Sequence, residues 1–410
     1  PDSIAWLLNV RGDDVPFSPL PLCFAIIYAD GTVDLFAAAE KTSPQLKAHL
    51  GDAVLIKEPA DFGPALDGMA KTGKPVCLDH DSAADWLQRR LAAAGIEILH
   101  RADPCQPAKA RKNDVELAGM RAAHLRDGVA LARFLAWLAA EGGGADEIGA
   151  AERLEGLRRQ NDLYRGPSFA TISAAGANAA IVHYPVTAKT NRKLEPGSLY
   201  LVDSGGQYQD GTTDVTRTVL IGGGGAAKGQ LADEMRDRFT RVLKGHIAVA
   251  AAVFPVGTTG GELDPLARQA LWRAGLDYDH GTGHGVGCYL GVHEGPQRIS
   301  KTPGGVALEP GMILSNEPGY YKKGAYGIRI ENLMAVIDAP SPGGAERDLL
   351  AFETLSLAPI DRNLIAVELM TGEEIAWLDA YHQRVRDAIS PLVDGKTKAW
   401  LKANTEMISR

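Results

Sequence analysis

Cysteine is scarce in this chain, with four among 410 residues and none in a CxxC pair. This number and spacing argue against a disulfide framework or a thiolate metal site and predict buried, reduced thiols. Dense Lys/Arg runs are also missing and the net charge is -8, which argues against a nucleic-acid binder. No apolar run approaches the roughly 18–20 residues that span a bilayer. We therefore expect a cytoplasmic protein that contacts neither nucleic acid nor membrane.

The length and composition that remain are those of a globular protein with more than one core. A chain of 410 residues with 45% apolar and 23% charged residues predicts two domains. Residues 1–106 read as a small α/β domain without a catalytic cluster. Phe24–Tyr28 and Val33–Phe36, separated by Asp30-Gly31, are expected to form a hairpin. Further strands are expected at Val54–Ile56, Val76–Leu78 and Ile96–Leu99, a helix at Ala83–Ala94, and a linker at Asp103–Pro107.

A longer α/β segment follows, which we divide into residues 107–350 and a C-terminal extension, 351–410. Asn113 and Glu116 form a capping box at the start of a long helix that ends at Gly142–Gly144. Further helices are expected at 145–160, 228–254, 265–274 (capped by Asp264, with Pro265 in its first turn) and 371–407, and strands near Ile172, Leu199–Asp203 and Val215–Ile221, with Gly222–Gly225 as a flexible loop.

Two aspartates eleven residues apart form the first candidate site. Asp203 ends an apolar strand and Asp214 begins the next one. A hairpin between them would bring both carboxylates to one edge of a sheet. Taken alone, the pair is equally consistent with two turn aspartates.

The second candidate segment is glycine-rich and carries two histidines, His280 and His284. The interleaved glycines disfavour a helix, and no glutamate follows the first histidine, so this is not a zincin helix. Glycines at these positions suit a close backbone approach to a ligand or metal. The alternative is that one of the histidines simply packs in a turn.

Two glutamates, Glu317 and Glu331, each end a short apolar strand. A carboxylate in apolar surroundings is costly unless a positive charge pairs with it, and Arg329 can serve only part of this set. A pair of divalent cations would neutralise four carboxylates that share one imidazole. An oxygen-rich site of this kind suits Mn²⁺ or Co²⁺ and favours Zn²⁺ less, and of these we expect Mn²⁺. Two such ions about 3.5–4 Å apart hydrolyse amides through a bridging hydroxide.

The order Asp, Asp, His, Glu, Glu, with its flanking motifs, resembles the pita-bread metallopeptidases, and most closely the long aminopeptidase P branch. The resemblance covers nearly the whole chain from Ile4–Gly12 onward, and its most specific segments are Asp210–Thr218, Val242–Val249, His280–Gly287 and Val292–Pro296. It implies a pita-bread catalytic domain behind a smaller creatinase-like N-terminal α/β domain. It also implies removal of the N-terminal residue from peptides with proline in second position, and a homodimer.

The resemblance assigns roles residue by residue. Asp203 would bind one metal, His284 and Glu317 the other, and Asp214 and Glu331 both, with Glu317 as general base. His293 would donate to the substrate carbonyl or the tetrahedral oxyanion, and His183 would be a second catalytic histidine of this kind. The substrate pocket would be lined by His183, His280, His293, Tyr321 and Arg329. The remaining histidines (His49, His80, His100, His124, His246 and His382) are expected at the surface or in packing.

Two other functions compete with this interpretation. A prolidase would share the metals but accept only dipeptides, and the residues after Phe352 favour the aminopeptidase P branch. A metal-free binding module with a peptidase-like fold would lack ligands, whereas all five are present. The branch normally carries a further α/β domain upstream, which we expect to be missing from this chain, since it begins at Pro1 rather than Met.

Overall fold

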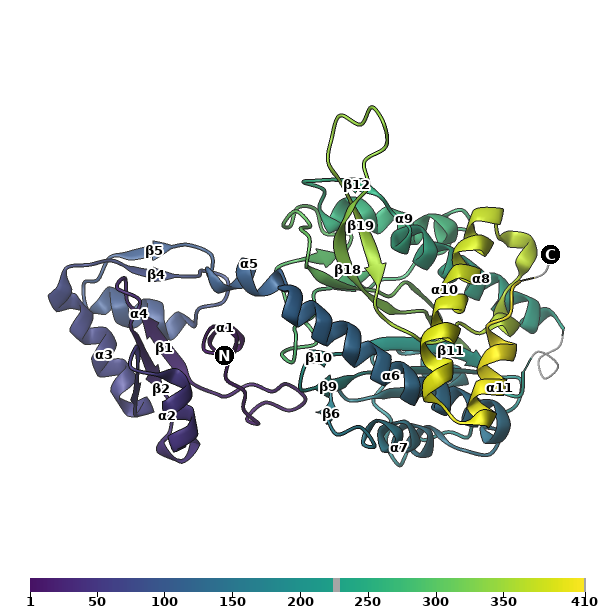
Figure 1. Ribbon diagram of the computed structural model, residues 1–410, viewed down its shortest axis with the longest axis horizontal. Coiled ribbons are helices and arrows are strands. Elements are labelled where there is room, and N and C mark those ends of the chain that lie inside the picture. Colours follow the sequence, from purple (N-terminus) through teal and green to yellow (C-terminus); the bar gives the residue numbers. More distant parts are fainter. Residues whose placement is uncertain (224–228, 409–410) are drawn as a thin grey trace. The chain divides into compact units, whose positions relative to one another are not determined.

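The computed structural model describes residues 1–223 and 229–408 and divides the chain into two compact units, Pro1–Lys109 and Ala110–Arg410 (Figure 1). Gly224 and Gly225 of the expected loop lie outside the described residues. None of the described helices has the length and apolar content needed to cross a bilayer.

The N-terminal unit is an α/β domain, as predicted. The expected hairpin is confirmed, with Phe24 opposite Phe36, and its second strand continues into a parallel pairing. Strands β1 (Phe24–Ile27), β2 (Val33–Phe36) and β3 (Val54–Lys57) form one sheet, β4 (Val76–Leu78) and β5 (Ile98–His100) pair separately, and the helices are α1 (Asp2–Leu7), α2 (Pro44–Leu50), α3 (Phe62–Gly68) and α4 (Asp85–Ala93).

The structure adds a helix to the expected linker of this region and contradicts one other expectation. The expected linker contains a short helix, α5 (Cys105–Ala110), because the Asp103 carboxylate accepts a hydrogen bond from the Cys105 N–H (2.8 Å) and caps it. Pro107 lies in the first turn, where no helical N–H bond is lost. Cys77 is exposed rather than buried, since it is the outward-facing residue of β4, while the other three cysteines are buried and all four are free.

The second unit begins with a long helix and contains three sheets of three or four strands. The capping box of Asn113 and Glu116 is confirmed. The helices are α6 (Asp114–Glu141), α7 (Glu147–Arg158), α8 (Gln230–Ala250), α9 (Gly260–Trp272), α10 (Gly372–Ile389) and α11 (Gly395–Asn404). The strand orders are β11-β8-β7, β12-β19-β18-β15 and β10-β9-β6.

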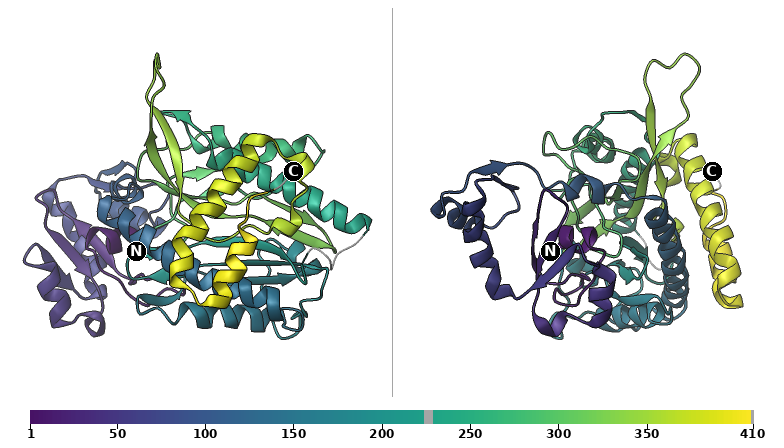
Figure 2. Two further views of the ribbon diagram at one scale, coloured as in Figure 1. Left: turned by 45° about the vertical axis from the view of Figure 1, so that its right-hand side comes forward. Right: turned by 60° about the vertical axis from the view of Figure 1, so that its left-hand side comes forward.

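The strands of this unit carry the predicted site. They are β6 (Tyr164–Pro167), β7 (Ile172–Ala175), β8 (Leu199–Ser204), β9 (Gly206–Tyr208), β10 (Gly211–Thr212), β11 (Val215–Leu220), β12 (Phe254–Pro255), β13 (Gly283–His284), β14 (Arg298–Ile299), β15 (Ile313–Asn316), β16 (Gly319–Lys322), β17 (Tyr326–Arg329), β18 (Asn332–Ala339) and β19 (Leu349–Thr354). Helix α7 packs on β7 and α6, while α8 packs on α9 and α10 (Figures 1 and 2).

Helix α9 starts earlier than predicted. Thr259, not Asp264, caps it, and Glu262 completes a capping box. Asp264 is instead buried inside the helix, where it accepts hydrogen bonds from Arg268 and from the Thr282 hydroxyl. The pair Gly260–Gly261 lowers helix propensity and concealed the true start.

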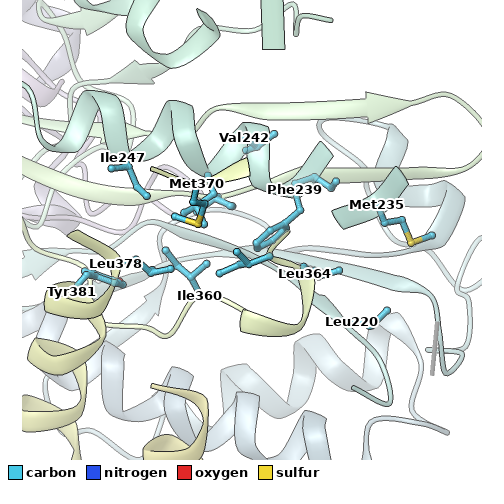
Figure 3. Close-up of a cluster of buried hydrophobic side chains, with 14 of the residues drawn as sticks. Leu220, Met235, Phe239, Val242, Ile247, Ile360, Leu364, Met370, Leu378 and Tyr381 are labelled. Atoms are coloured by element: carbon cyan, nitrogen blue, oxygen red, sulfur yellow. The ribbon is translucent and has the colours of Figure 1, made fainter. Parts of the chain in front are cut away.

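The largest buried apolar cluster joins α8 to the C-terminal region. Figure 3 shows side chains of α8 and α10 converging with those of the segment between β19 and α10. Its labelled members include Phe239, Val242, Ile247, Ile360, Leu364, Met370, Leu378 and Tyr381. The C-terminal extension therefore shares its apolar core with helix α8.

Helices α8 and α9 approach so closely that a side chain is excluded at one position. A Cβ atom on Gly245 would lie 2.0 Å from the carbonyl oxygen of Ala267. Only glycine fits at this contact without a shift of backbone.

Candidate metal centre

One antiparallel strand pair brings the two candidate aspartates together, although only Asp203 lies within a strand. Strand β8 pairs with β11, with Asp203 opposite Thr216, and Asp214 directly precedes β11. The chain between the strands forms a further hairpin, β9 with β10. Both carboxylates are buried, with Asp203 8% and Asp214 4% exposed.

The glycine-rich segment is extended, not helical, at His284. Strand β13 contains only Gly283 and His284 and pairs with β14. Cβ atoms on Gly283 and Gly285 would lie 1.9 Å and 2.0 Å from the carbonyl oxygens of Ser315 and Glu294. These glycines therefore allow the segment to lie against neighbouring backbone.

The two glutamates lie at adjoining strand ends. Glu317 directly follows β15, as expected. Glu331 lies between β17 and β18, one residue before β18 begins, rather than at the end of a strand. Because β15 and β18 are antiparallel, with Asn316 opposite Asn332, both glutamates leave the sheet at the same edge.

The structure gathers these side chains into one cluster. The Nε2 atom of His284 lies 3.5 Å from Oδ2 of Asp214 and 3.5 Å from Oε1 of Glu317. Asp214, His284 and Glu331 each present one ligand atom within 4.8 Å of the others. The Nδ1 atom of His284 donates to the Gly285 carbonyl (2.9 Å), which leaves Nε2 directed at the carboxylates.

Proximity and burial shift the pKa values of the cluster strongly. Burial raises the pKa of Asp214, raises that of Glu317 to about 7 and raises that of Glu331 well above its ordinary value, and the neighbouring carboxylates add to each shift. Burial alone would lower the pKa of His284, but its hydrogen bond to Asp214 and the charge of Glu317 raise it to about 9. The cluster thus lacks positive charge.

The donor set fits a divalent cation. Oδ1 of Asp203 and Oδ1 of Asp214 are buried atoms without a hydrogen-bond partner. A buried carboxylate oxygen without a partner is costly, and a metal ion would satisfy it. Carboxylates with one imidazole are ligands for Mn²⁺, Co²⁺ or Zn²⁺.

Among the described residues, Arg329 is the guanidinium that forms an ion pair with a carboxylate of this cluster, and it pairs with Asp203. Its Nη2 donates to Oδ2 of Asp203 (2.6 Å) and its Nη1 to the Tyr321 hydroxyl (2.8 Å). That hydroxyl lies 2.9 Å from Nε2 of His280, whose Nδ1 faces the Gly281 carbonyl at 2.7 Å. Tyr321 therefore accepts from Arg329 and donates to His280.

His293 and His183 border the same cluster and are both exposed. The ring of His293 lies 4.2 Å from that of His284, centroid to centroid, in an edge-on arrangement. Desolvation and the charge of His284 lower the pKa of His293 to about 4, so its ring is neutral near pH 7. Nη1 of Arg329 also donates to the carbonyl of Val182 (3.4 Å), the residue before His183, which brings this segment to the cluster.

Two hydroxyl groups donate hydrogen bonds to carboxylates of the cluster, and neither was predicted from the sequence. Thr216 Oγ1 accepts from Nε of Arg329 (3.1 Å) and donates to Glu331 (2.7 Å). Ser315 Oγ accepts from the His284 N–H (2.9 Å) and donates to Glu317 (3.2 Å). Strand alternation carried a signal for Thr216, since it lies two residues after Asp214 and so on the same face of its strand.

Fold and cluster together define a peptidase-type metal-binding protein. Three family profiles match the chain: Creatinase/Prolidase N-terminal domain at residues 1–116, Metallopeptidase family M24 at 118–338, and the C-terminal region of peptidase M24 at 348–408. The chain belongs to metallopeptidase family M24, and the expected pita-bread fold is confirmed.

Similar proteins agree with the aminopeptidase P resemblance. A "Probable Xaa-Pro aminopeptidase P" of Talaromyces marneffei is 44% identical over 99% of this chain and 63% of its own length. "Aminopeptidase P2" of Arabidopsis thaliana is 41% identical over 100% of this chain and 61% of its own length. The chain thus spans less than two thirds of these relatives.

Solved structures give the same result. The X-prolyl aminopeptidase of Caenorhabditis elegans, described as a cytosolic enzyme with a di-nuclear active site, matches with TM-score 0.91 and 38% identity, over 99% of this chain and 67% of that one. Prolidase from Pyrococcus furiosus matches with TM-score 0.64 and 21% identity, over 87% and 94%, which shows the fold alone.

Proposed function

We propose that this chain carries the catalytic centre of a metalloaminopeptidase that removes the N-terminal residue from peptides with proline in second position. The observation that carries the proposal is the buried cluster of Asp214, His284 and Glu331, in which Asp214 has an oxygen atom without a partner. The similarity to Xaa-Pro aminopeptidases supports the choice of substrate.

We propose two divalent cations as cofactors, with Mn²⁺ as the native metal. Asp203 would bind one, His284 and Glu317 the other, and Asp214 and Glu331 both. When bound, such a pair polarises a carbonyl and lowers the pKa of water. Thr216 and Ser315 hold Glu331 and Glu317 in place through the bonds described above.

The protein side chains would move the protons of the reaction. Glu317 would take a proton from the attacking water, a role that suits a carboxylate whose pKa lies near 7 in the metal-free protein. The neutral ring of His293 would donate an N–H to the substrate oxygen as negative charge develops there. The proton held by Glu317 would then pass to the departing proline nitrogen.

The rim of the cluster would select proline. An Xaa-Pro bond has no amide N–H, so an enzyme that recognises it must hold the carbonyl and the ring instead. His183, His280, His293, Tyr321 and Arg329 would line this subsite. The hydrogen bonds from Arg329 to Tyr321 and from Tyr321 to His280 hold three of these side chains in one arrangement.

The test compares matched peptides. Purified protein, treated with chelator and then given Mn²⁺, should release Xaa from Xaa-Pro-Yaa, cut Xaa-Ala-Yaa far more slowly and leave N-acetyl-Xaa-Pro-Yaa intact. Cleavage confined to Xaa-Pro dipeptides would indicate a prolidase instead. Equal cleavage of the alanine and proline peptides would contradict the proposed subsite.

We also propose a cytosolic homodimer, as the aminopeptidase P resemblance implies. The description of the Caenorhabditis elegans protein as a cytosolic enzyme supports the location. Sedimentation at micromolar concentration tests the dimer, and a single monomeric species would refute it.

A further inference from the structure

His246, near the C-terminal end of α8, is completely buried and hydrogen-bonded on both sides of its ring. Its Nδ1 lies 3.0 Å from the Asn316 carbonyl oxygen, and its Nε2 lies 3.2 Å from Nδ2 of Asn332. Its own carbonyl accepts from Nδ2 of Asn316 (2.9 Å). All three residues are 0% exposed, so none of these bonds competes with water.

The two asparagines occupy special positions in the sheet. Asn316 is the last residue of β15, Asn332 is the first of β18, and the two are directly opposite each other. Each is the chain neighbour of a proposed metal ligand, Glu317 or Glu331. Because His246 is hydrogen-bonded to both asparagines, it fixes the positions in β15 and β18 from which Glu317 and Glu331 leave the sheet.

The donors and acceptors of this network have one consistent assignment. Oδ1 of Asn332 accepts from Nη2 of Arg217 (2.8 Å), so its Nδ2 must face His246. Nε2 of His246 is then the acceptor, and Nδ1 carries the proton that goes to the Asn316 carbonyl. Burial and the charge of Arg217 lower the pKa of His246 to about 3, which agrees with a neutral ring.

Packing alone does not require histidine here. The ring contacts Trp377 of α10 (centroids 6.1 Å apart), and an apolar side chain would make the same contact. Such a side chain would, however, leave the Asn316 carbonyl and the Asn332 amide with one fewer partner in a dry interior. His246 therefore stabilises the ends of β15 and β18 through its hydrogen bonds, a role that an apolar core residue could not fill.

We propose that His246 is a positioning residue for the metal centre, which sets the spacing of Glu317 and Glu331 by clamping Asn316 to Asn332. The inference rests on the proposed function in that these glutamates bind metal. Residues that orient metal ligands typically change affinity by about 10–100-fold when replaced.

The experiment measures Mn²⁺ binding by calorimetry in chelator-treated protein, independently of peptide cleavage. His246→Leu should weaken Mn²⁺ binding by about 10–100-fold, and His246→Gln, whose amide both donates and accepts, should weaken it less. His124→Leu is the matched control, because His124 is also buried but its ring bonds only to the Met120 carbonyl among the described groups. It should bind Mn²⁺ like the wild type.

Binding by His246→Leu within about threefold of the wild type would overturn the proposal, as would an equal loss in His124→Leu. If His246→Leu does not fold, His246→Asn decides, because its side chain is too short to reach both asparagines. Weakened binding then supports the clamp and wild-type binding overturns it. Wild-type protein that takes up no Mn²⁺ would instead contradict the metal centre itself.

Discussion

Thr216 shows how single residues make a crowded acidic site tolerable. Its hydroxyl accepts from Arg329, which is bound to Asp203, and donates to Glu331. Thr216 and Arg329 together thus connect Glu331 to Asp203, two carboxylates that would otherwise only repel each other. The carboxylates of the site therefore share few hydrogen-bond donors. In the proposed metal centre, the role of each carboxylate would depend on which metal ion it binds.

The two carboxylates proposed to bridge the metal ions, Asp214 and Glu331, should matter most for metal content. Asp214→Asn and Glu331→Gln should each lose most of both ions, because an amide oxygen binds divalent metal poorly and each bridge serves two sites. Asp203→Asn should retain about one ion per chain. Elemental analysis after dialysis against Mn²⁺ measures this, and equal loss in all three variants would contradict the assignment of bridges.

His293 should act in the reaction without holding metal. His293→Ala is expected to lower kcat by roughly 10²–10³-fold, the effect of removing one donor to a developing oxyanion. Metal content should stay at the wild-type level, since His293 is not one of the five proposed ligands. Loss of metal in this variant would show that the histidine is a ligand.

Among the helices and strands, sequence motifs predicted the structure correctly where short-range interactions alone determine it. The capping box at Asn113 and the hairpin at Phe24–Phe36 were foreseeable because short-range chemistry decides both. The cap at Thr259 was hidden by two glycines, and Asp264 resembled a cap until folding placed Arg268 and Thr282 beside it. His246 gave no local signal, because its two partners lie 70 and 86 residues away in sequence.

Two helical glycines should respond oppositely to alanine. Gly245→Ala should destabilise the protein by about 1–3 kcal/mol, because the added methyl meets the Ala267 carbonyl. Gly156→Ala, in α7, should stabilise it by about 0.5–1 kcal/mol, since a Cβ there meets nothing within 4 Å and alanine favours a helix. Urea unfolding of both variants measures the difference, and a neutral Gly245→Ala would contradict the tight α8–α9 contact.

For the whole molecule, the acidic cluster links stability to pH when metal is removed. The raised pKa of Glu317 means that its stabilising contribution is complete below its ordinary value of 4.5 and is lost as pH rises through about 7. The contribution of His284 is likewise complete below 6.5 and lost as pH rises through about 9. Both groups act in the same direction.

Histidines whose pKa values are lowered by burial oppose this decline only below their ordinary value of 6.5. Metal-free protein should therefore melt at progressively lower temperature as pH rises from about 6.5 to about 9, while Mn²⁺-loaded protein should not show this decline. Thermal melts with and without chelator measure the difference. Glu317→Gln provides the control, since it removes one titrating group and should flatten the metal-free profile over its lower half. A metal-free melting temperature that rises across this range would contradict the cited shifts.

The proposed ligands extend from Asp203 to Glu331, and the ion pair between Arg329 and Asp203 spans 126 residues. Closing so long a loop costs conformational entropy, and only the contacts of the assembled sheet offset this cost. A nascent chain therefore has no metal site until Glu331 has left the ribosome and β18 has paired with β15. Metal binding at the proposed site would then occur late in folding, and it would stabilise only chains whose strands have already paired in the native register.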